Sequence, residues 1–151
     1  MKTIGITGPT GAGKTTALNA LRTLGAEVVD ADAVYHRLLA ESGELKKTLV
    51  EAFGEKILDE LGKIDRRRLS SAVYPHRLEE LNALTHPIIV AEIGRMAGEA
   101  EGAGRPALAI DAIALVESGL ARRCDVVVAV LAPQELRLRR VMARDGVDEG
   151  Y

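Results

Sequence analysis

The sequence predicts an α/β fold, in which helices flank a parallel sheet in three layers. Two observations support this class. Four short, largely apolar runs are separated by helical patterns or long connections, which favours parallel strands over hairpins. Residues 42–104, between the second and third runs, show helical patterns without a convincing strand. We therefore expect a parallel sheet with a helical lobe inserted between its second and third strands.

The first half of the expected sheet begins with a strand over 2–7, "KTIGIT". A helix is expected over 15–24, where leucines recur at helical spacing and Gly25 follows as a stop. A strand over 27–30 and a helix over 32–40 come next. This order of strand, helix, strand and helix is typical of a parallel sheet.

The helical block and the second half of the sheet follow. Asp65 is typical of an N-cap for a helix over 66–73. Pro87 is typical of the first residue of a helix that runs to about Ala100, because the N–H that proline lacks is unpaired at that position. The remaining elements expected are a strand over 106–111, a strand over 125–131 and a helix after Pro133 through Arg144. Both strands are continuously apolar, which predicts that they are buried.

The composition excludes several classes of function. The 151 residues carry a net charge of −2, without a basic region that would hold nucleic acid or an anionic membrane. Aromatic residues make up 3% and tryptophan is absent, which argues against a surface that stacks single-stranded bases. No apolar run approaches the roughly 18 residues of a membrane span, and the N-terminus does not resemble a signal peptide. We expect a cytoplasmic protein without nucleic-acid or membrane partners, and no pattern indicates an oligomeric state.

The stretch "GPTGAGKTT" directly follows the first expected strand and matches G-x-x-x-x-G-K-[ST], the phosphate loop or P-loop. Glycines let backbone N–H groups turn toward an anion, and the following helix adds the partial positive charge of its N-terminus. Lys14 can reach the β- and γ-phosphates of a nucleotide, and the Thr15 hydroxyl can bind Mg²⁺. The residues expected to hold ATP are Gly8, Gly11, Ala12, Gly13, Lys14, Thr15 and Thr16. The fold expected is therefore that of the P-loop NTPases.

A small-molecule kinase fits this loop better than a switch or a motor. The chain lacks the N-K-x-D segment that reads guanine, and a motor ATPase would normally be larger. A kinase needs a carboxylate beside the acceptor hydroxyl, and Asp30 and Asp32 follow the second expected strand. From local sequence alone, Asp32 is equally well explained as the N-cap of the next helix.

Two further features have both a functional and a structural interpretation. Asp111 ends the third expected strand, where P-loop proteins hold a carboxylate associated with magnesium, although an acid there can simply start a turn. Arg137, Arg140 and Arg144 share one helical stripe and could close over the triphosphate as a lid. The alternative is a solvated charged face.

Several segments together resemble the dephospho-CoA kinase family. They are "IGITGPTGAGKTT", "LGAEVVDADAVYHRLL", "FGEKIL" with "GKIDRRRL", "LNALTHPII", "LVESGL" and "DVVVAVLAPQELRLRRVMARDG", in order over essentially the whole chain. The Asp-Ala-Asp and Leu-Asn-x-x-x-His-Pro segments distinguish the family from other P-loop kinases. The resemblance implies ATP-dependent phosphorylation of the ribose 3′-hydroxyl of dephospho-CoA, the last step of coenzyme A biosynthesis, with ATP and Mg²⁺ as cofactors.

The resemblance also implies roles for residues. Lys14, Asp32, Arg140 and Arg144 would be catalytic, with Asp32 beside the acceptor hydroxyl; Asp32, His86 and Asp111 would contact substrate; and Thr15 and, indirectly, Asp111 would hold Mg²⁺. It implies one kinase domain over 1–151, with a core of 1–41 and 104–136. The helical insertion facing CoA would cover about 42–103, and the start of the lid about 137–151.

The chain departs from the family's pattern at three places. It reads Asp111-Ala-Ile-Ala-Leu-Val-Glu117 where the family usually has D-x-P-L-L-F-E, and Arg137 replaces a usual Gln. Family members continue past Tyr151 through the rest of the lid, a further strand and a terminal helix, so we expect the C-terminal end of their fold to be missing. Two alternatives remain open: another nucleoside or nucleotide kinase, or a nucleotide-binding module without turnover.

Overall fold

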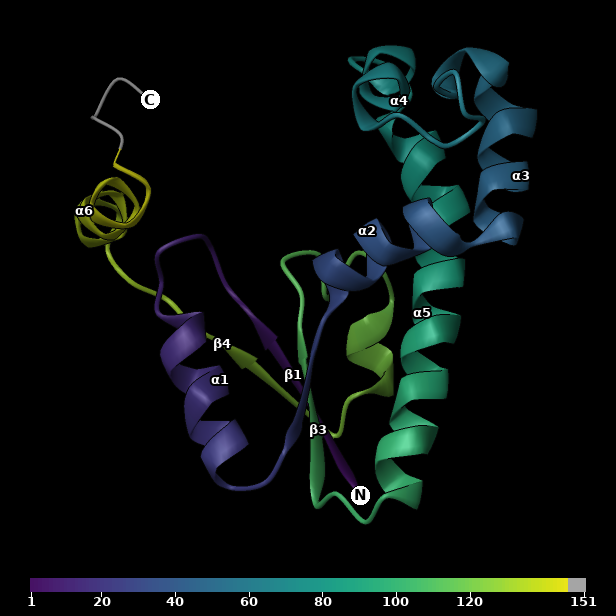
Figure 1. The fold of residues 1–151 in the computed structure, drawn as a ribbon. Coiled ribbons are helices and arrows are strands. Elements are labelled where there is room, and N and C mark those ends of the chain that lie inside the picture. The colour runs from purple at the N-terminus through teal and green to yellow at the C-terminus, as the bar shows by residue number, and fades with distance from the viewer. Residues whose placement is uncertain (147–151) are drawn as a thin grey trace. The chain divides into compact units, whose positions relative to one another are not determined.

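The first of two structural units is built on a four-stranded parallel sheet with the strand order β2-β3-β1-β4 (Figure 1). The computed structural model describes residues 1–146. This unit comprises residues 1–30 and the chain from Met96 onward, and residues 31–95 form the second unit. The strands are β1 (Lys2–Thr7), β2 (Glu27–Asp30), β3 (Ala107–Asp111) and β4 (Val126–Ala129). The four expected strands and their parallel arrangement are confirmed.

Helix α1 (Lys14–Thr23) packs on one face of this sheet, where Ile6, Leu18 and Ala109 form a buried cluster. The other face is covered by the segment after β3, which includes the short helix η2 (Leu120–Arg123). Gly5 allows this close packing, because a Cβ there would lie 2.7 Å from a methyl of Leu115. The central strand β1 is therefore enclosed from both sides.

Strand β4 differs from the expectation of a buried strand. Its residues Val126, Val127 and Val128 are 53%, 45% and 38% exposed. The reason is its place at the edge of the sheet, where β1 is its only strand partner among the described residues. An apolar groove of about 380 Å³, lined by side chains of β1, α1 and β4, lies beside it.

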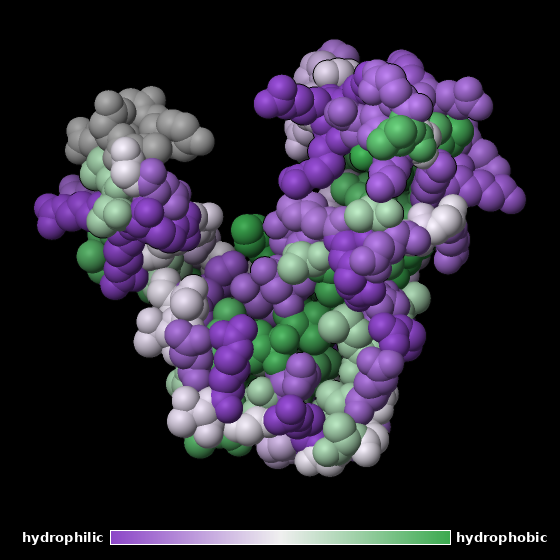
Figure 2. All heavy atoms as spheres, viewed as in Figure 1, coloured by the Kyte–Doolittle hydropathy of each residue, from purple (hydrophilic) through white to green (hydrophobic). Residues whose placement is uncertain are grey.

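The second unit is helical. Its elements are α2 (Ala31–Glu41), α3 (Gly43–Phe53), η1 (Glu55–Ile57), α4 (Arg66–Val73) and most of α5 (Leu78–Gly102). Its core side chains are fully or almost fully buried: Leu45, Leu49, Phe53, Ile57, Leu69 and Val73. The expected cap of α4 is confirmed, since the Asp65 carboxylate accepts hydrogen bonds from the N–H groups of Arg67 and Arg68. Hydrophilic residues cover much of the surface over α3 and α4 (Figure 2).

The prediction that Pro87 begins a helix is wrong, because Pro87 lies inside α5. Proline removes one hydrogen bond of a helix and costs about 3 kcal/mol or more in its interior. Thr85, Ile89 and Ile93, four residues apart along α5, are all buried. Burial of this stripe on both sides of Pro87 explains why the helix continues through it.

The last described helix, α6 (Gln134–Asp145), follows β4 and ends at Gly146, which has the left-handed conformation that favours glycine. This agrees with the helix expected after Pro133. The expected lid segment reaches Tyr151, but residues 147–151 lie outside the part of the chain described. Among the described residues, the helices are too short or too polar to cross a membrane.

Candidate phosphotransfer site

The phosphate loop joins β1 to α1, and later segments of the chain fix its shape. Gly8 has φ of +148°, and a Cβ at this position would lie 2.2 Å from the carbonyl oxygen of Val130. Gly11 has φ of +80°, and its Cβ would lie 2.7 Å from the carbonyl oxygen of Arg137. Only glycine combines these conformations with such close backbone contacts. The loop is therefore preformed in the first unit.

Helix α1 begins without a side-chain cap. Gly13 occupies the N-cap position in the left-handed conformation, and within residues 1–146 no side chain caps the helix by a hydrogen bond. The first N–H groups of a helix have no partner within the helix, and they carry its partial positive charge. Thr15 and Thr16 in this turn are exposed. The N-terminus of α1 is thus arranged to receive an anion such as a phosphate.

Lys14 and Asp111 form the charged centre of this site. The Lys14 ammonium nitrogen lies 3.2 Å from Asp111 Oδ1, and the two side chains are 15% and 22% exposed. The contact is one of charge, because Asp111 Oδ1 is buried and makes no hydrogen bond with any described residue. Register pairs Asp111 with both Ile6 and Asp30, which brings the ends of β1, β2 and β3 together. Buried carboxylate oxygens without a donor are sites where cations bind.

This oxygen chemistry suits Mg²⁺. The ion prefers oxygen ligands and keeps several waters and phosphate oxygens in its shell. The Thr15 hydroxyl in the first turn of α1 and the Asp111 carboxylate at the end of β3 are both oxygen groups of the required type. The residues present therefore fit the ion that the phosphate loop implies.

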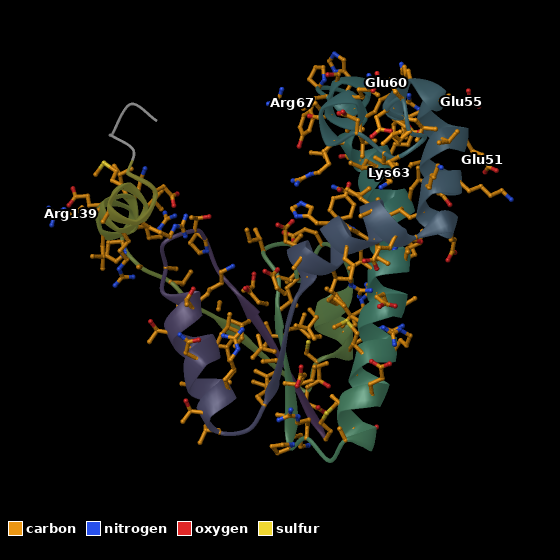
Figure 3. The ribbon with its side chains drawn as sticks, viewed as in Figure 1. Glu51, Glu55, Glu60, Lys63, Arg67 and Arg139 are labelled. Carbon is orange, nitrogen blue, oxygen red and sulfur yellow. The ribbon has the colours of Figure 1, made fainter. Side chains whose placement is uncertain are left out.

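The three arginines of the expected lid make different contacts. Arg140 donates a hydrogen bond of 3.0 Å to the carbonyl of Gly11 in the phosphate loop. Arg137 donates to the carbonyl of Ala132, and Arg144 binds the carboxylate of Asp145 through two hydrogen bonds. The neighbouring Arg139 points away from the unit (Figure 3). Of these side chains, Arg140 is the one that the structure brings to the loop.

Asp32 lies in the second unit, in the first turn of α2, and is 76% exposed. The alternative that it caps this helix is wrong, because α2 begins one residue earlier, at Ala31. An acidic residue in the first turn still interacts favourably with the helix dipole. The position leaves its carboxylate accessible to solvent and to a substrate.

Polar side chains surround Asp32 within the second unit. His36 lies one turn later, with its Nε2 3.8 Å from Asp32 Oδ1. Arg66 of α4 places its Nη2 3.0 Å from the same Nε2. The ring of Tyr35 lies 5.8 Å from that of His36, and burial raises the pKa of the Tyr35 phenol. We missed His36 and Arg66 in the sequence; the i,i+4 spacing from Asp32 signals His36, whereas no local pattern connects Arg66 to it.

His86 is half-buried on α5, directly before Pro87. His86 therefore lies in the interior of a helix. Its contact with a substrate stays a prediction.

Comparison with known proteins also indicates a kinase that uses a phosphate loop. The family model described as dephospho-CoA kinase matches residues 2–150. A dephospho-CoA kinase of Dehalococcoides mccartyi is 38% identical over 149 residues, covering 97% of this chain and 75% of the relative. One from Corynebacterium efficiens is 38% identical over 151 residues, with 99% and 76% covered.

Two solved structures are similar to this chain along nearly its whole length. The crystal structure of TT1252 from Thermus thermophilus superposes with a TM-score of 0.77 at 34% identity, covering 97% of this chain and 74% of that one. The dephospho-CoA kinase from Campylobacter jejuni gives a TM-score of 0.68 at 29% identity, with 98% and 75% covered. These proteins are thus about a third longer than the chain described here.

Proposed function

Because the chain belongs to the dephospho-CoA kinase family, we propose that it transfers the γ-phosphoryl group of ATP to the ribose 3′-hydroxyl of dephospho-CoA, which yields coenzyme A and ADP. The observation that carries the proposal is the preformed phosphate loop with Lys14 and Asp111 beside it. Such a loop serves many nucleotide-using proteins, and the family supplies the acceptor. We further propose that the reaction takes place in the cytoplasm, where ATP is abundant.

The phosphate loop would hold the donor. Its backbone N–H groups and Lys14 bind the β- and γ-phosphates, and Lys14 exchanges its contact with Asp111 for the phosphate oxygens. Thr15 would ligate Mg²⁺ directly, and Asp111 would hold it through water. When bound there, Mg²⁺ offsets the negative charge of the phosphate oxygens. Arg140 already reaches the loop at Gly11 and can turn a guanidinium N–H toward the γ-phosphate.

Asp32 would act on the acceptor. As the 3′-oxygen forms its bond to the γ-phosphorus, the bond from that phosphorus to the β-phosphate oxygen breaks, and ADP leaves. The Asp32 carboxylate takes the proton that the hydroxyl gives up. Its exposure of 76% supports this role, since the carboxylate must be accessible to the hydroxyl. Arg144 would assist as a second lid cation after leaving Asp145, and His86 would contact the acceptor.

The test is ADP formation by the purified chain with Mg-ATP, with and without dephospho-CoA, together with the mass of the product. We expect acceptor-dependent ADP and a product with the mass of coenzyme A. An acceptor panel separates this activity from that of another nucleoside or nucleotide kinase. ATP binding without turnover on any acceptor would instead indicate a nucleotide-binding module and contradict the proposal.

The role of Asp32 has its own test. Asp32→Ala should lower turnover by at least about a hundredfold while the affinity for ATP, measured by calorimetry, stays within about twofold. Glu41→Ala, at the exposed end of the same helix, is the matched control and should behave as the unmodified chain. Full turnover of Asp32→Ala would remove Asp32 from the mechanism.

A further inference from the structure

One nitrogen of His36 lies between two groups of opposite charge. Arg66 Nη2 approaches His36 Nε2 to 3.0 Å, which is hydrogen-bond distance. Asp32 Oδ1 lies 3.8 Å from the same nitrogen. The three residues belong to the second unit, where α2 carries Asp32 and His36 and α4 carries Arg66.

The contact with Arg66 determines where the imidazole carries its proton. A guanidinium has N–H donors and no acceptor, so it binds Nε2 only when that nitrogen presents its lone pair. His36 is then the neutral tautomer with its proton on Nδ1. In this state, the imidazole adds no positive charge beside Asp32.

Protonation of His36 reverses this arrangement. An imidazolium has N–H groups on both nitrogens, so Nε2 repels Arg66 and can donate to Asp32. A second positive charge beside the carboxylate makes Asp32 a weaker base. The other ionisable groups of this cluster are Tyr35 on α2, which interacts electrostatically with Asp32 and Arg66, and Tyr74 after α4, which interacts with Tyr35.

We propose that His36, held as a neutral acceptor by Arg66, is a positioning residue that keeps the Asp32 carboxylate basic enough to take the proton of the acceptor hydroxyl. The inference rests on the proposed function for its effect on turnover. The bond between Arg66 and His36 is independent of that function. Substitutions at His36, Arg66 and Asp32, together with one spectroscopic measurement, distinguish the failure of the inference from the failure of the proposed function.

The first readout is the pH profile of kcat. In the unmodified chain, we expect turnover to fall on acidification, because a proton on His36 Nε2 breaks its bond with Arg66 and adds a positive charge beside Asp32. His36→Gln keeps an acceptor for Arg66 but does not titrate, so this loss should disappear while the KM for ATP is unchanged. His76→Gln, at an exposed histidine of the same unit, is the control, and its kcat should still fall on acidification.

The second readout concerns Arg66. Arg66→Met removes the donor and the positive charge that favour a neutral His36, so the loss of turnover should begin at a higher pH. Arg66→Lys keeps a donor and should restore much of the original profile. Arg67→Met, on the next residue of α4 and exposed, should leave the profile in place. A merely structural role for these residues would lower turnover equally at every pH.

The deciding measurement is the ¹⁵N NMR spectrum of the His36 imidazole in the full chain at about pH 8. We expect an unprotonated Nε2 in the unmodified protein, and a gain of proton occupancy on Nε2 in Arg66→Met. A proton on Nε2 in the unmodified protein, or an unchanged acid limb in His36→Gln, would overturn the inference. If Asp32→Ala retained turnover while the NMR result held, the proposed function of Asp32 would fail and the Arg66–His36 bond would stand.

Discussion

Glu92 on α5 forms ion pairs whose contribution to the stability of the second unit can be measured. Its carboxylate accepts a hydrogen bond of 2.7 Å from Arg37 of α2 and two hydrogen bonds, of 2.7 and 3.0 Å, from Arg95. These bonds lower the pKa of Glu92 from its ordinary value of 4.5 to about 2. Glu92→Gln keeps the size of the side chain and removes its charge.

The pKa gives the magnitude of this effect. At 1.36 kcal/mol per pKa unit, the difference between 4.5 and about 2 corresponds to an upper limit of roughly 3 kcal/mol. Arg37 and Arg95 are 39% and 54% exposed, so water screens the pairs. We therefore expect Glu92→Gln to lower the free energy of unfolding by about 1–2 kcal/mol at neutral pH.

The sign of the pH dependence follows from the lowered pKa. The contribution of Glu92 is complete above pH 4.5 and is lost as the pH falls from 4.5 toward 2. The difference between the unmodified chain and Glu92→Gln should therefore shrink on acidification to about pH 3. Comparing the two chains at each pH cancels the titration of the other carboxylates.

The assay is urea unfolding followed by far-ultraviolet circular dichroism, because the chain lacks tryptophan for fluorescence. Glu51→Gln is the matched control, since Glu51 lies on α3 and points into solvent (Figure 3). It should change the free energy of unfolding by less than about 0.5 kcal/mol. Equal stability of Glu92→Gln and Glu51→Gln at neutral pH would refute the reasoning. So would a difference between the unmodified chain and Glu92→Gln that is as large at about pH 3 as at neutral pH.

Two further predictions concern the phosphate loop. Lys14→Met should weaken ATP binding at least about tenfold in calorimetry, or ~1.4 kcal/mol. Lys47→Met, on the exposed face of α3, is the control and should leave the affinity unchanged. Equal affinities of the two variants for ATP would contradict the role of Lys14. Gly8→Ala should lower the melting temperature, because its Cβ would collide with the carbonyl of Val130. Gly43→Ala is the control, because a Cβ there would meet nothing within 4 Å beyond its chain neighbours and its own helix backbone. It should be neutral or stabilising by up to about 1 kcal/mol. A larger loss of stability in Gly43→Ala than in Gly8→Ala would contradict the argument.

Local patterns predicted most of the secondary structure because each element carries its own signal. The Asp65 cap was predicted, and the strands of the sheet were predicted within one or two residues of their observed bounds. Pro87 was misplaced because the burial of Thr85 and Ile89 on either side of it depends on packing that a proline rule does not contain. The exposure of β4 likewise depends on strand order, which the apolar run "VVVA" does not encode.

The candidate site was predictable where a single motif carries it. The G-x-x-x-x-G-K-[ST] motif located the phosphate loop between β1 and α1. Asp32, which local sequence explained equally well as a helix N-cap, lies in the first turn of α2. Contacts between distant segments had no such signal. The approach of Arg140 to Gly11, and of Arg66 to His36, joins residues from separate elements. Side-chain partners of this kind become visible only when the chain is folded.

The parallel pairing of β1 with β3 and β4 also affects when the sheet can form during synthesis. Strand β1 leaves the ribosome before its partners β3 and β4, which follow roughly a hundred residues later. At roughly 5–20 residues per second, that interval is about 5–20 seconds. During it, Ile4 and Ile6 have no sheet to join, and the loop that they lead into lacks the contacts of Val130 and Arg137 that fix its glycines. We therefore expect the nascent chain to bind nucleotide only after β4 and α6 have emerged.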